Sequence, residues 1–474
     1  MRAHRLAKLE ELRRQGIHPY PNDFRPTHTT AEVHRRYGGR EDLEGLEERV
    51  RVAGRMMAFR DFGRAVFSHL QDGQGRIQIH VRRDVVGPEQ FDRFKRLVDV
   101  GDILGVEGVP FRTRTGELTI RVEQLRLLAK ALRDLPEKWH GLTDVEARYR
   151  RRYLDLMANP EVRDLFKTRA RIIQYLREFL TRRGFVEVET PVLQPLAGGA
   201  AARPFRTFHH ALQTEMYLRI APELYLKRLL VGGLDRVFEL GKSFRNEGVD
   251  SLHNPEFTML EFYQAYATYE DLMHLTEEMI AGVAREVLGT TALGQLELRP
   301  PWRRISLRDA LLAEGVPPSA LHDREEALRI ARGLGVALEG DEPLGKLLVE
   351  IFERVVEPKL IQPTFVTHWP VEVSPLARRF DHDPNVVERF ELFMLGREVA
   401  NAFSELNDPL DQRERFLQQA ARGGQVDEDF LQALEHGMPP AAGEGIGVDR
   451  LVMTLTGRHS IREVMLFPQL RPQR

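Results

Sequence analysis

The 474-residue sequence is too long for one hydrophobic core and predicts two to four domains. Its 42% hydrophobic and 30% charged residues indicate a soluble globular protein, and its lack of cysteine excludes disulfides, thiolate metal sites and thiol nucleophiles. No run approaches about 18 apolar residues, and the N-terminal MRAHRLAKLEELRRQG is typical of a charged amphipathic helix rather than a signal peptide. We therefore expect a cytoplasmic protein without a membrane span.

Short strands are predicted between residues 50 and 128, where apolar and polar residues alternate between glycines and aspartates. There are five such stretches, and the helical pattern PEQFDRFKRLV stands between the third and the fourth. This order is that of an OB-fold barrel, a common binder of single-stranded nucleic acid, although another small β-barrel fits the pattern about as well. A basic excess in residues 1–150, against an acidic remainder, favours nucleic-acid contact in this region.

From residue 160 onward the pattern alternates long helices with strands. PEVRDLFKTRARIIQYLREFLTRRG has apolar residues at helical spacing, and helical patterns return at 269–289 and over much of 306–356. The stretch 306–356 contains no obvious chemistry. The strand patterns are FVEVETPVL, PTFVTHW and RFELFMLGREVANAFSEL.

The stretch FRNEGVDSLHNPEFTMLEFY (244–263) is predicted to form a hairpin that holds charged residues among apolar ones. Arg245 and Glu247 share one face of the first strand, because they are two residues apart. On the second strand one face holds Phe257, Met259, Glu261 and Tyr263. Such a face fits a zwitterionic or phosphorylated ligand, and a structural cluster of ion pairs is the alternative.

In RFELFMLGREVANAFSELND (389–408), two carboxylates flank a predicted tight turn at Gly396. Glu391 and Glu398 could approach each other across the hairpin, where they would repel unless a cation lies between them, and hard oxygen ligands suit Mg²⁺. Asn401, Phe403 and Glu405 share one face. Strict alternation places Glu398 on the opposite face, so a bulge or the turn must reorient it.

AAGEGIGVDRLVMTL (441–455) holds three glycines before a helical pattern. G-x-G-x-x-G fails at residue 448, and too few residues follow for a βαβ unit, so a dinucleotide loop is a poor fit. We interpret the segment as a strand kept free of side chains, against whose backbone a flat ligand can lie. Arg450 would project from the helix start towards an anion.

Together these blocks resemble the class II aminoacyl-tRNA synthetases, and within them the lysyl-tRNA synthetase family of bacterial type. FRNEG…HNPEF resembles motif 2 of that class, GEGIGVDRLVM motif 3 and GFVEVETPVL motif 1. The resemblance runs from about residue 5 to 472 and is weakest across 290–350. Further shared stretches are AGGAAARPF, MYLRIAPELYLKRLLVGG, THWPVEVSPLARR, NAFSELNDPLDQRERF and SIREVMLFPQLRP.

The resemblance implies an α+β multidomain fold, with an N-terminal OB-fold β-barrel and a class II catalytic domain whose mainly antiparallel sheet is flanked by helices. Motif 1 forms the dimer interface throughout this subclass, so we expect a homodimer. The implied domains are an N-terminal helical extension (1–48), an OB-fold anticodon-binding domain (49–130), a linker (131–155) and a catalytic domain (156–474) with a helical insertion at about 290–360.

The family activates L-lysine with ATP to lysyl-adenylate and transfers the lysyl group to the 3′ end of tRNA(Lys), releasing AMP and diphosphate. By resemblance, Arg245 and Arg450 are the catalytic residues, and the Arg245 guanidinium holds the α-phosphate through bidentate hydrogen bonds. Phe257 would stack on adenine, and Glu391 and Glu398 would bind Mg²⁺. The implied ATP-binding residues are Arg245, Glu247, His253, Asn254, Phe257, Glu391 and Arg450.

The lysine substrate carries two ammonium groups, so its implied pocket is acidic. Glu223 and Gly199 match the α-amino contacts, and Glu261, Tyr263 and Glu405 match the ε-ammonium contacts. Asn401 matches a carboxylate contact, and Phe403 and Gly447 line the pocket. We expect the buried charges to be paired only when the ligands bind. Glutamates at 261 and 405 would repel aspartate, which excludes the related aspartyl enzymes.

In the barrel, the family's anticodon-reading positions are matched by Arg60, Phe67, Gln78 and Glu117. A ring that stacks on an unpaired base, with polar groups that read its edge, is the usual recognition of single-stranded RNA. Two other functions stay open: a paralogue that attaches lysine to a protein, and a non-catalytic RNA-binding relative. Leu252 departs from the family pattern, which has arginine there.

Overall fold

The computed structural model describes residues 2–135, 142–200, 202–421 and 425–472. The chain divides into two compact units, Met1–Thr143 and Asp144–Arg474. Within the described ranges, no helix is long and apolar enough to cross a membrane.

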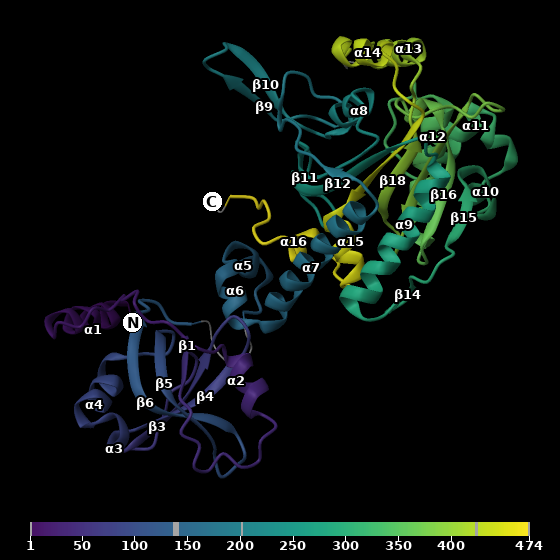
Figure 1. The fold of residues 1–474 in the computed structure, drawn as a ribbon. Coiled ribbons are helices and arrows are strands. Elements are labelled where there is room, and N and C mark those ends of the chain that lie inside the picture. Colours follow the sequence, from purple (N-terminus) through teal and green to yellow (C-terminus); the bar gives the residue numbers. More distant parts are fainter. Residues whose placement is uncertain (1, 136–141, 201, 422–424, 473–474) are drawn as a thin grey trace. The chain divides into compact units, whose positions relative to one another are not determined.

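A closed β-barrel forms the first unit (Figure 1). Five long strands run in the order β1-β5-β6-β4-β3, and a further pairing of β1 with β3 closes the barrel. The predicted helix between β4 and β5 is present as α4, which confirms the predicted topology; the short helix α3 before it and the two-residue strand β2 on the edge of β3 were not predicted. The strands are β1 (Val50–Met56), β2 (Arg60–Asp61), β3 (Ala65–Gln71), β4 (Arg76–Arg82), β5 (Ile103–Arg112) and β6 (Leu118–Ala129), and the helices are α1 (Arg2–Arg14), α2 (Thr30–Tyr37), α3 (Arg83–Val86) and α4 (Pro88–Leu97).

Alternation of side chains explains this barrel. Along β1 every second residue is buried, and Val50, Val52 and Met56 are fully inside. Phe91 and Phe94 of α4 complete the same apolar core. The polar residues between the buried ones therefore lie on the outer face of the strands, where they are available for contacts.

An eight-stranded sheet forms the centre of the second unit (Figure 1). Its order is β15-β16-β17-β18-β19-β12-β11-β7, and all pairs are antiparallel except β15–β16 and β11–β7. This confirms the mainly antiparallel sheet. The strands are β7 (Val186–Glu187), β11 (Arg236–Phe244), β12 (Glu256–Ala265), β15 (Arg303–Ser306), β16 (Thr364–Pro370), β17 (Val386–Phe393), β18 (Glu398–Ser404) and β19 (Ala441–Gly447).

One face of this sheet is covered by helices α7 (Pro160–Arg182), α9 (Tyr269–Val283) and α15 (Val448–Leu455). Their apolar residues and those of the strands form the main core of the unit. The remaining helices are α5 (Val145–Arg150), α6 (Arg152–Ala158), α8 (Glu223–Val231), α10 (Leu307–Ala313), α11 (Arg324–Gly333), α12 (Leu344–Val355), α13 (Pro409–Ala420), α14 (Glu428–Glu435) and α16 (Ile461–Val464). Smaller sheets consist of β8 (Leu193–Gln194), β9 (Arg206–His209) and β10 (Thr214–Leu218), and of β13 (Ala292–Leu293) and β14 (Leu296–Glu297).

The structure corrects two predicted strands. The stretch FVEVETPVL (185–193) contains only the two-residue strand β7 and the first residue, Leu193, of the two-residue strand β8. Strand β11 ends at Phe244, so Arg245 and Glu247 lie in the loop before β12 rather than on one face of a strand. The loop is fixed by backbone bonds, since the Arg245 N–H donates to Pro255 O (2.8 Å) and the Glu247 N–H to Arg245 O (2.9 Å).

Glu444 of β19 points into the core, because it alternates with the glycines on the opposite face. Its carboxyl group accepts hydrogen bonds from Thr276 Oγ1 at 2.8 and 2.6 Å. Burial raises the pKa of Glu444 to about 8, and the Thr276 hydrogen bond opposes this rise. The side chain is therefore protonated in the folded protein at neutral pH.

A carboxyl group whose pKa is raised by folding makes the free energy of unfolding decrease as the pH rises. In the unfolded chain Glu444 titrates near its ordinary pKa of 4.5. Its contribution is therefore complete below pH 4.5 and is lost as the pH rises through 8. We expect Glu444→Gln to be neutral at pH 5 and to stabilise the fold by roughly 2 to 4 kcal/mol at pH 9. Thermal unfolding at several pH values checks this, with the exposed Glu435→Gln as control; equal destabilisation by Glu444→Gln at every pH would contradict it.

Candidate active site

One face of the sheet carries the predicted site residues because of its register. Cα partners on five adjacent strands align Glu239 (β11), Glu261 (β12), Gly445 (β19), Asn401 (β18) and Glu391 (β17). Cross-strand partners share a face, so these residues lie on the side opposite the main core. The sheet thereby brings together residues that are up to 206 positions apart in the printed sequence.

The glycines of β19 leave the middle of this face bare. A Cβ atom at Gly443 would lie 2.2 Å from the Tyr263 ring and 2.3 Å from Glu405 Oε1, so the protein itself requires glycine there. At Gly445 and Gly447 the nearest atoms would be 3.7 and 3.8 Å away, which is ordinary contact. The absence of side chains at these two positions leaves the strand backbone open to a ligand, as the sequence interpretation requires.

The acidic pocket beside this strand contains a cation that the sequence analysis did not predict. Lys227 of α8 is fully buried, and its Nζ lies 2.7 Å from Glu223 Oε1 and forms a second ion pair with Glu405 Oε2. The expectation that these charges are paired only when ligands bind is therefore wrong for Glu223 and Glu405. A lysine four residues after Glu223 on a helix is the sequence signal that could have revealed this pair.

One ammonium group does not neutralise three carboxylates. Glu405 Oε1 is buried without a hydrogen-bond partner among the described residues. Glu261 is 6% exposed, and Tyr263 OH donates to its Oε2 at 3.2 Å. Burial and the charge of Glu223 raise the pKa of Glu261 to about 8. Burial, opposed by Lys227, likewise raises the pKa of Glu405 to about 8, so the pocket lacks the positive charge that would keep all three carboxyl groups ionised at neutral pH.

The remaining predicted lysine contacts surround this pocket. Gly199 has φ +86°, and a Cβ there would lie 3.2 Å from Glu223 Cβ, so glycine is required beside the start of α8. The Phe403 ring centroid lies 5.3 Å from Lys227 Nζ. Asn401 Oδ1 accepts a hydrogen bond from Arg389 Nε at 2.9 Å. Burial, followed by the neighbouring carboxylates, raises the pKa of Tyr263, so its hydroxyl remains a donor.

Most of the predicted ATP residues belong to the loop between β11 and β12 and to the start of β12, whereas Glu391 is on β17 and Arg450 on α15. The Arg245 guanidinium carbon is 5.1 Å from the centroid of the Phe257 ring, and Arg245 Nε is buried without a hydrogen-bond partner among the described residues. Glu247 is exposed in the loop. Leu252 packs against the main core. The Phe257 ring can stack on a nucleotide base, and the Arg245 guanidinium beside it has an unused donor for the neighbouring phosphate.

A hydrogen-bonded chain joins this loop to α15. Arg450 Nη2 donates to His253 Nε2 (3.0 Å), and Asp250 Oδ2 lies 2.9 Å from His253 Nδ1. Arg450 Nη1 also pairs with Glu398 Oε2 at 3.0 Å. Asn254 differs from its predicted neighbours, since its amide donates to Glu256 O (2.6 Å) and accepts from the Gln469 N–H (3.1 Å). The NH₂ group and the oxygen of the Asn254 side chain are thus both hydrogen-bonded within the protein rather than left for ATP.

A β-bulge brings Glu398 to the site. Leu392 pairs with Ala400 but Phe393 pairs with Glu398, which leaves Val399 as the extra residue. This extra residue reverses the alternation, so Glu398 shares a face with Asn401. Of the two possibilities considered for Glu398, a bulge or the turn, the structure shows the bulge.

Two further carboxylates, Glu353 and Glu357, lie near the predicted magnesium ligands Glu391 and Glu398. Burial raises the pKa of Glu391 to about 8; Arg389, 2.5 Å away, opposes this rise, and Glu398, Glu357 and Glu353 add to it. Among the described residues, no three His, Asp or Glu side chains are arranged to hold a metal alone. Two carboxylates surrounded by further negative charge fit Mg²⁺, which takes its other oxygen ligands from phosphates and water. Glu353 belongs to 306–356, the stretch in which the sequence showed no obvious chemistry, and Glu357 follows it directly.

The four predicted anticodon residues lie together on the barrel. Arg60 is the register partner of Phe67, and Gln78 Nε2 donates to Glu117 Oε2 at 2.7 Å. The Phe67 ring stacks on His80, with centroids 4.1 Å apart and an interplanar angle of 8°. His80 was not predicted, although it stands two residues after Gln78 and so shares its face. Burial lowers the pKa of His80, so this stack is neutral.

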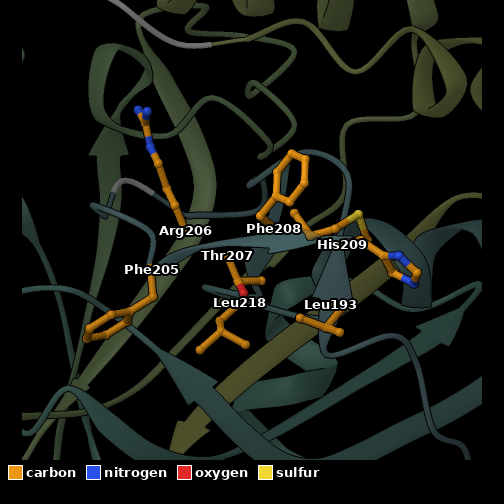
Figure 2. Close-up of a pocket in the computed structure, with 8 residues that line it drawn as sticks. Leu193, Phe205, Arg206, Thr207, Phe208, His209 and Leu218 are labelled. Atoms are coloured by element: carbon orange, nitrogen blue, oxygen red, sulfur yellow. The ribbon is translucent and has the colours of Figure 1, made fainter. Parts of the chain in front are cut away.

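A cavity of about 420 Å³ lies outside the predicted site, on the β8–β10–β9 sheet (Figure 2). Exposed apolar side chains gather in and near this sheet, namely Val186, Val192, Leu193, Phe208 and Leu212. Its lining contains no carboxylate and none of the predicted site residues. The lining residues are Leu193, Phe205, Arg206, Thr207, Phe208, His209, Met216 and Leu218.

Comparison with known proteins assigns both units. Residues 144–471 match the family model of tRNA synthetases class II (D, K and N), and residues 50–128 match that of the OB-fold nucleic acid binding domain. The chain is 55% identical to the lysine–tRNA ligase of Moorella thermoacetica over 99% of this chain and 97% of the relative. It is 53% identical to those of Pelotomaculum thermopropionicum (99% and 94%) and Carboxydothermus hydrogenoformans (99% and 97%). Because the synthetase model matches residues 144–471 and these relatives match nearly the whole chain, this chain belongs to the class II tRNA synthetases of the D, K and N type.

Proposed function

We propose that the chain is a lysine–tRNA ligase, which activates L-lysine with ATP to lysyl-adenylate and transfers lysine to the 3′ end of tRNA(Lys), releasing AMP and diphosphate. One observation supports lysine most strongly. Glu223, Glu261 and Glu405 converge on one pocket in which Lys227 is the partner of only two of them. A substrate with two ammonium groups supplies the missing charge.

The same charges disfavour the substrates of the aspartyl and asparaginyl enzymes. Aspartate would place a second carboxylate against Glu261 or Glu405, both buried. Burying such a mispaired charge costs several kcal/mol, or roughly 10³-fold in discrimination. Asparagine would leave the buried carboxylates without a cation, which is also costly.

The chemistry requires no protein nucleophile. A carboxylate oxygen of lysine attacks the α-phosphorus of ATP, a new C–O–P linkage forms, and the bond to the diphosphate breaks. Arg245 is positioned to donate to the α-phosphate, while Arg450 and His253 meet the outer phosphates; Glu247 would accept from the adenine amino group. Positioning and charge stabilisation of this kind account for most of the acceleration in such displacements.

We assign Glu391 and Glu398 as the residues that would hold Mg²⁺ in the presence of ATP. The ion would neutralise phosphate charge and orient the diphosphate as a leaving group. Arg450 pairs with Glu398 in the structure, and Arg389 with Glu391. These two arginines keep the carboxylates apart and oriented before the nucleotide binds.

Charging of tRNA tests the function directly. Purified protein with ATP and unfractionated tRNA should attach lysine to tRNA and attach neither aspartate nor asparagine. Attachment of lysine to a protein but not to tRNA would favour the protein-lysylating alternative. Adenylate formation and transfer both absent would favour the non-catalytic RNA-binding alternative.

The barrel is proposed to read the anticodon of tRNA(Lys) through Arg60, Phe67, Gln78 and Glu117. His80 stacks on one face of the Phe67 ring and Phe62 lies edge-on to it, with centroids 5.8 Å apart; an unpaired base would stack on the part of the ring that they leave exposed. Stacking of a base is worth about 1–3 kcal/mol. We therefore expect Phe67→Ala to lower kcat/KM for tRNA about 10- to 100-fold. Pyrophosphate exchange, which requires no tRNA, should be unchanged; an equal loss in both assays would show a defect elsewhere.

We also propose a homodimer in the cytoplasm. The exposed apolar residues of β7 and of the β8–β10–β9 sheet, which include the motif 1 stretch, support a second copy as their partner. Sedimentation of a monomer at micromolar concentration would refute this. The domain limits 1–48, 49–130, 131–155 and 156–474 remain part of the proposal; the division into compact units falls between Thr143 and Asp144.

A further inference from the structure

We propose that Lys227 is a positioning residue that sets the separation of the two carboxylates that receive the α- and ε-ammonium groups, and thereby selects lysine over diamino acids of other lengths. This inference rests on the proposed function, since it assumes that Glu223 and Glu405 contact the substrate.

The geometry is that of a bridge. Lys227 Nζ lies 2.7 Å from Glu223 Oε1 and forms an ion pair with Glu405 Oε2, so one buried ammonium group joins the two acids. Glu223 belongs to the first turn of α8, whereas Glu405 follows β18. The bridge therefore links α8 to the residue that follows β18.

Each bridged carboxylate keeps its other oxygen for the pocket. Glu223 Oε2 is the oxygen that faces Gly199, since a Cβ built on that glycine would lie 3.8 Å from it. Glu405 Oε1 faces Gly443 and has no hydrogen-bond partner among the described residues. The two carboxylate oxygens that Lys227 does not contact are thus left for the two ammonium groups of a diamino acid, and Lys227 fixes one carboxylate relative to the other.

The surroundings leave Lys227 little freedom. Its side chain is 0% exposed, and the Phe403 ring lies beside its ammonium group at 5.3 Å. Without it, two buried carboxylates would repel each other, and their separation would no longer be fixed. The remaining acid, Glu261, is held by Tyr263 rather than by Lys227, so the effect should be confined to the spacing between Glu223 and Glu405.

Discrimination by length is the measurement that separates this role from a merely structural one. Ornithine is one methylene shorter than lysine, and a rigid pocket distinguishes one methylene by about 10- to 200-fold. In Lys227→Met, which keeps the length and removes the charge, we expect KM for lysine to rise about 100-fold, while KM for ATP is unchanged. The lysine-to-ornithine ratio of kcat/KM should fall at least about 10-fold. Lys167→Met, at an exposed lysine of α7, is the matched control.

Lys227→Arg provides a second variant that keeps the charge. Its wider guanidinium would hold the two carboxylates further apart, so we expect the lysine-to-ornithine ratio to change although the pocket keeps its net charge. A ratio within twofold of the wild type in the folded variants would overturn the proposal; if only Lys227→Arg folds, its ratio decides alone. Lysine-dependent ATP–pyrophosphate exchange by the wild type is measured first. Its absence would refute the proposed function, whereas an unchanged ratio in the variants would refute only this inference.

Discussion

Arg245→Ala is expected to lower lysine-dependent ATP–pyrophosphate exchange by about 10³-fold or more. Removal of a single preorganised donor to a developing charge costs about 10²–10³ in rate, and Arg245 can supply two such donors. The free protein holds this guanidinium against Phe257 with its Nε unsatisfied, so the group is positioned before the substrate binds. Most of the loss should appear in kcat, because the contact strengthens as the α-phosphorus is attacked.

Two comparisons sharpen the prediction for Arg245. Arg245→Lys keeps the charge but loses the planar fork, so it should restore only a minor part of the activity. Arg329→Ala, at an exposed arginine of α11, should leave exchange unchanged. Exchange by Arg245→Ala within tenfold of the wild type would show that the β11–β12 loop does not hold the reacting phosphate.

Glu261→Gln is expected to weaken lysine binding in a manner that depends on pH. The pKa of Glu261 is raised to about 8, first by burial and then by Glu223. At pH 6.5 the carboxyl group must release its proton when the lysine ammonium binds, so kcat/KM for lysine should rise up to about tenfold per pH unit until pH 8. Above that pH the group is already charged, while free lysine retains its ε-ammonium up to a pKa of about 10.4.

The glutamine variant removes this titration. We expect KM for lysine to increase about 10²-fold at pH 8.5, because a buried ammonium loses its charged partner, and to increase less at pH 6.5. KM for ATP should be unchanged, and Glu414→Gln, at an exposed position of α13, should behave as the wild type. An equal loss at both pH values would contradict the raised pKa of Glu261.

The parts of the site that followed from sequence are those that depend on strand alternation. Glu261 and Tyr263 on β12 share a face as predicted, and the glycines of β19 lie beside them. The same alternation places Glu444, within the glycine stretch, in the core. Strand periodicity is local, so it can be read from a few residues.

The features of the site that could not be predicted from the sequence depend on contacts between segments that are separated along the chain. Arg389 of β17 donates to Asn401 of β18 across the hairpin, and Glu357 reaches the bulged strand from the region after α12. The end of β11 at Phe244 was also not predicted, because Arg245 and Glu247 continue the alternation of the strand although its pairing with β12 ends at Phe244. Tertiary hydrogen bonding decided each of these features.

ATP–pyrophosphate exchange with each of the twenty amino acids tests the central claim most directly: that buried negative charge on this sheet selects the substrate. Lysine alone should support exchange, and aspartate and asparagine should give no signal above the blank. Exchange with aspartate but not with lysine would contradict the account, whatever else the pocket binds.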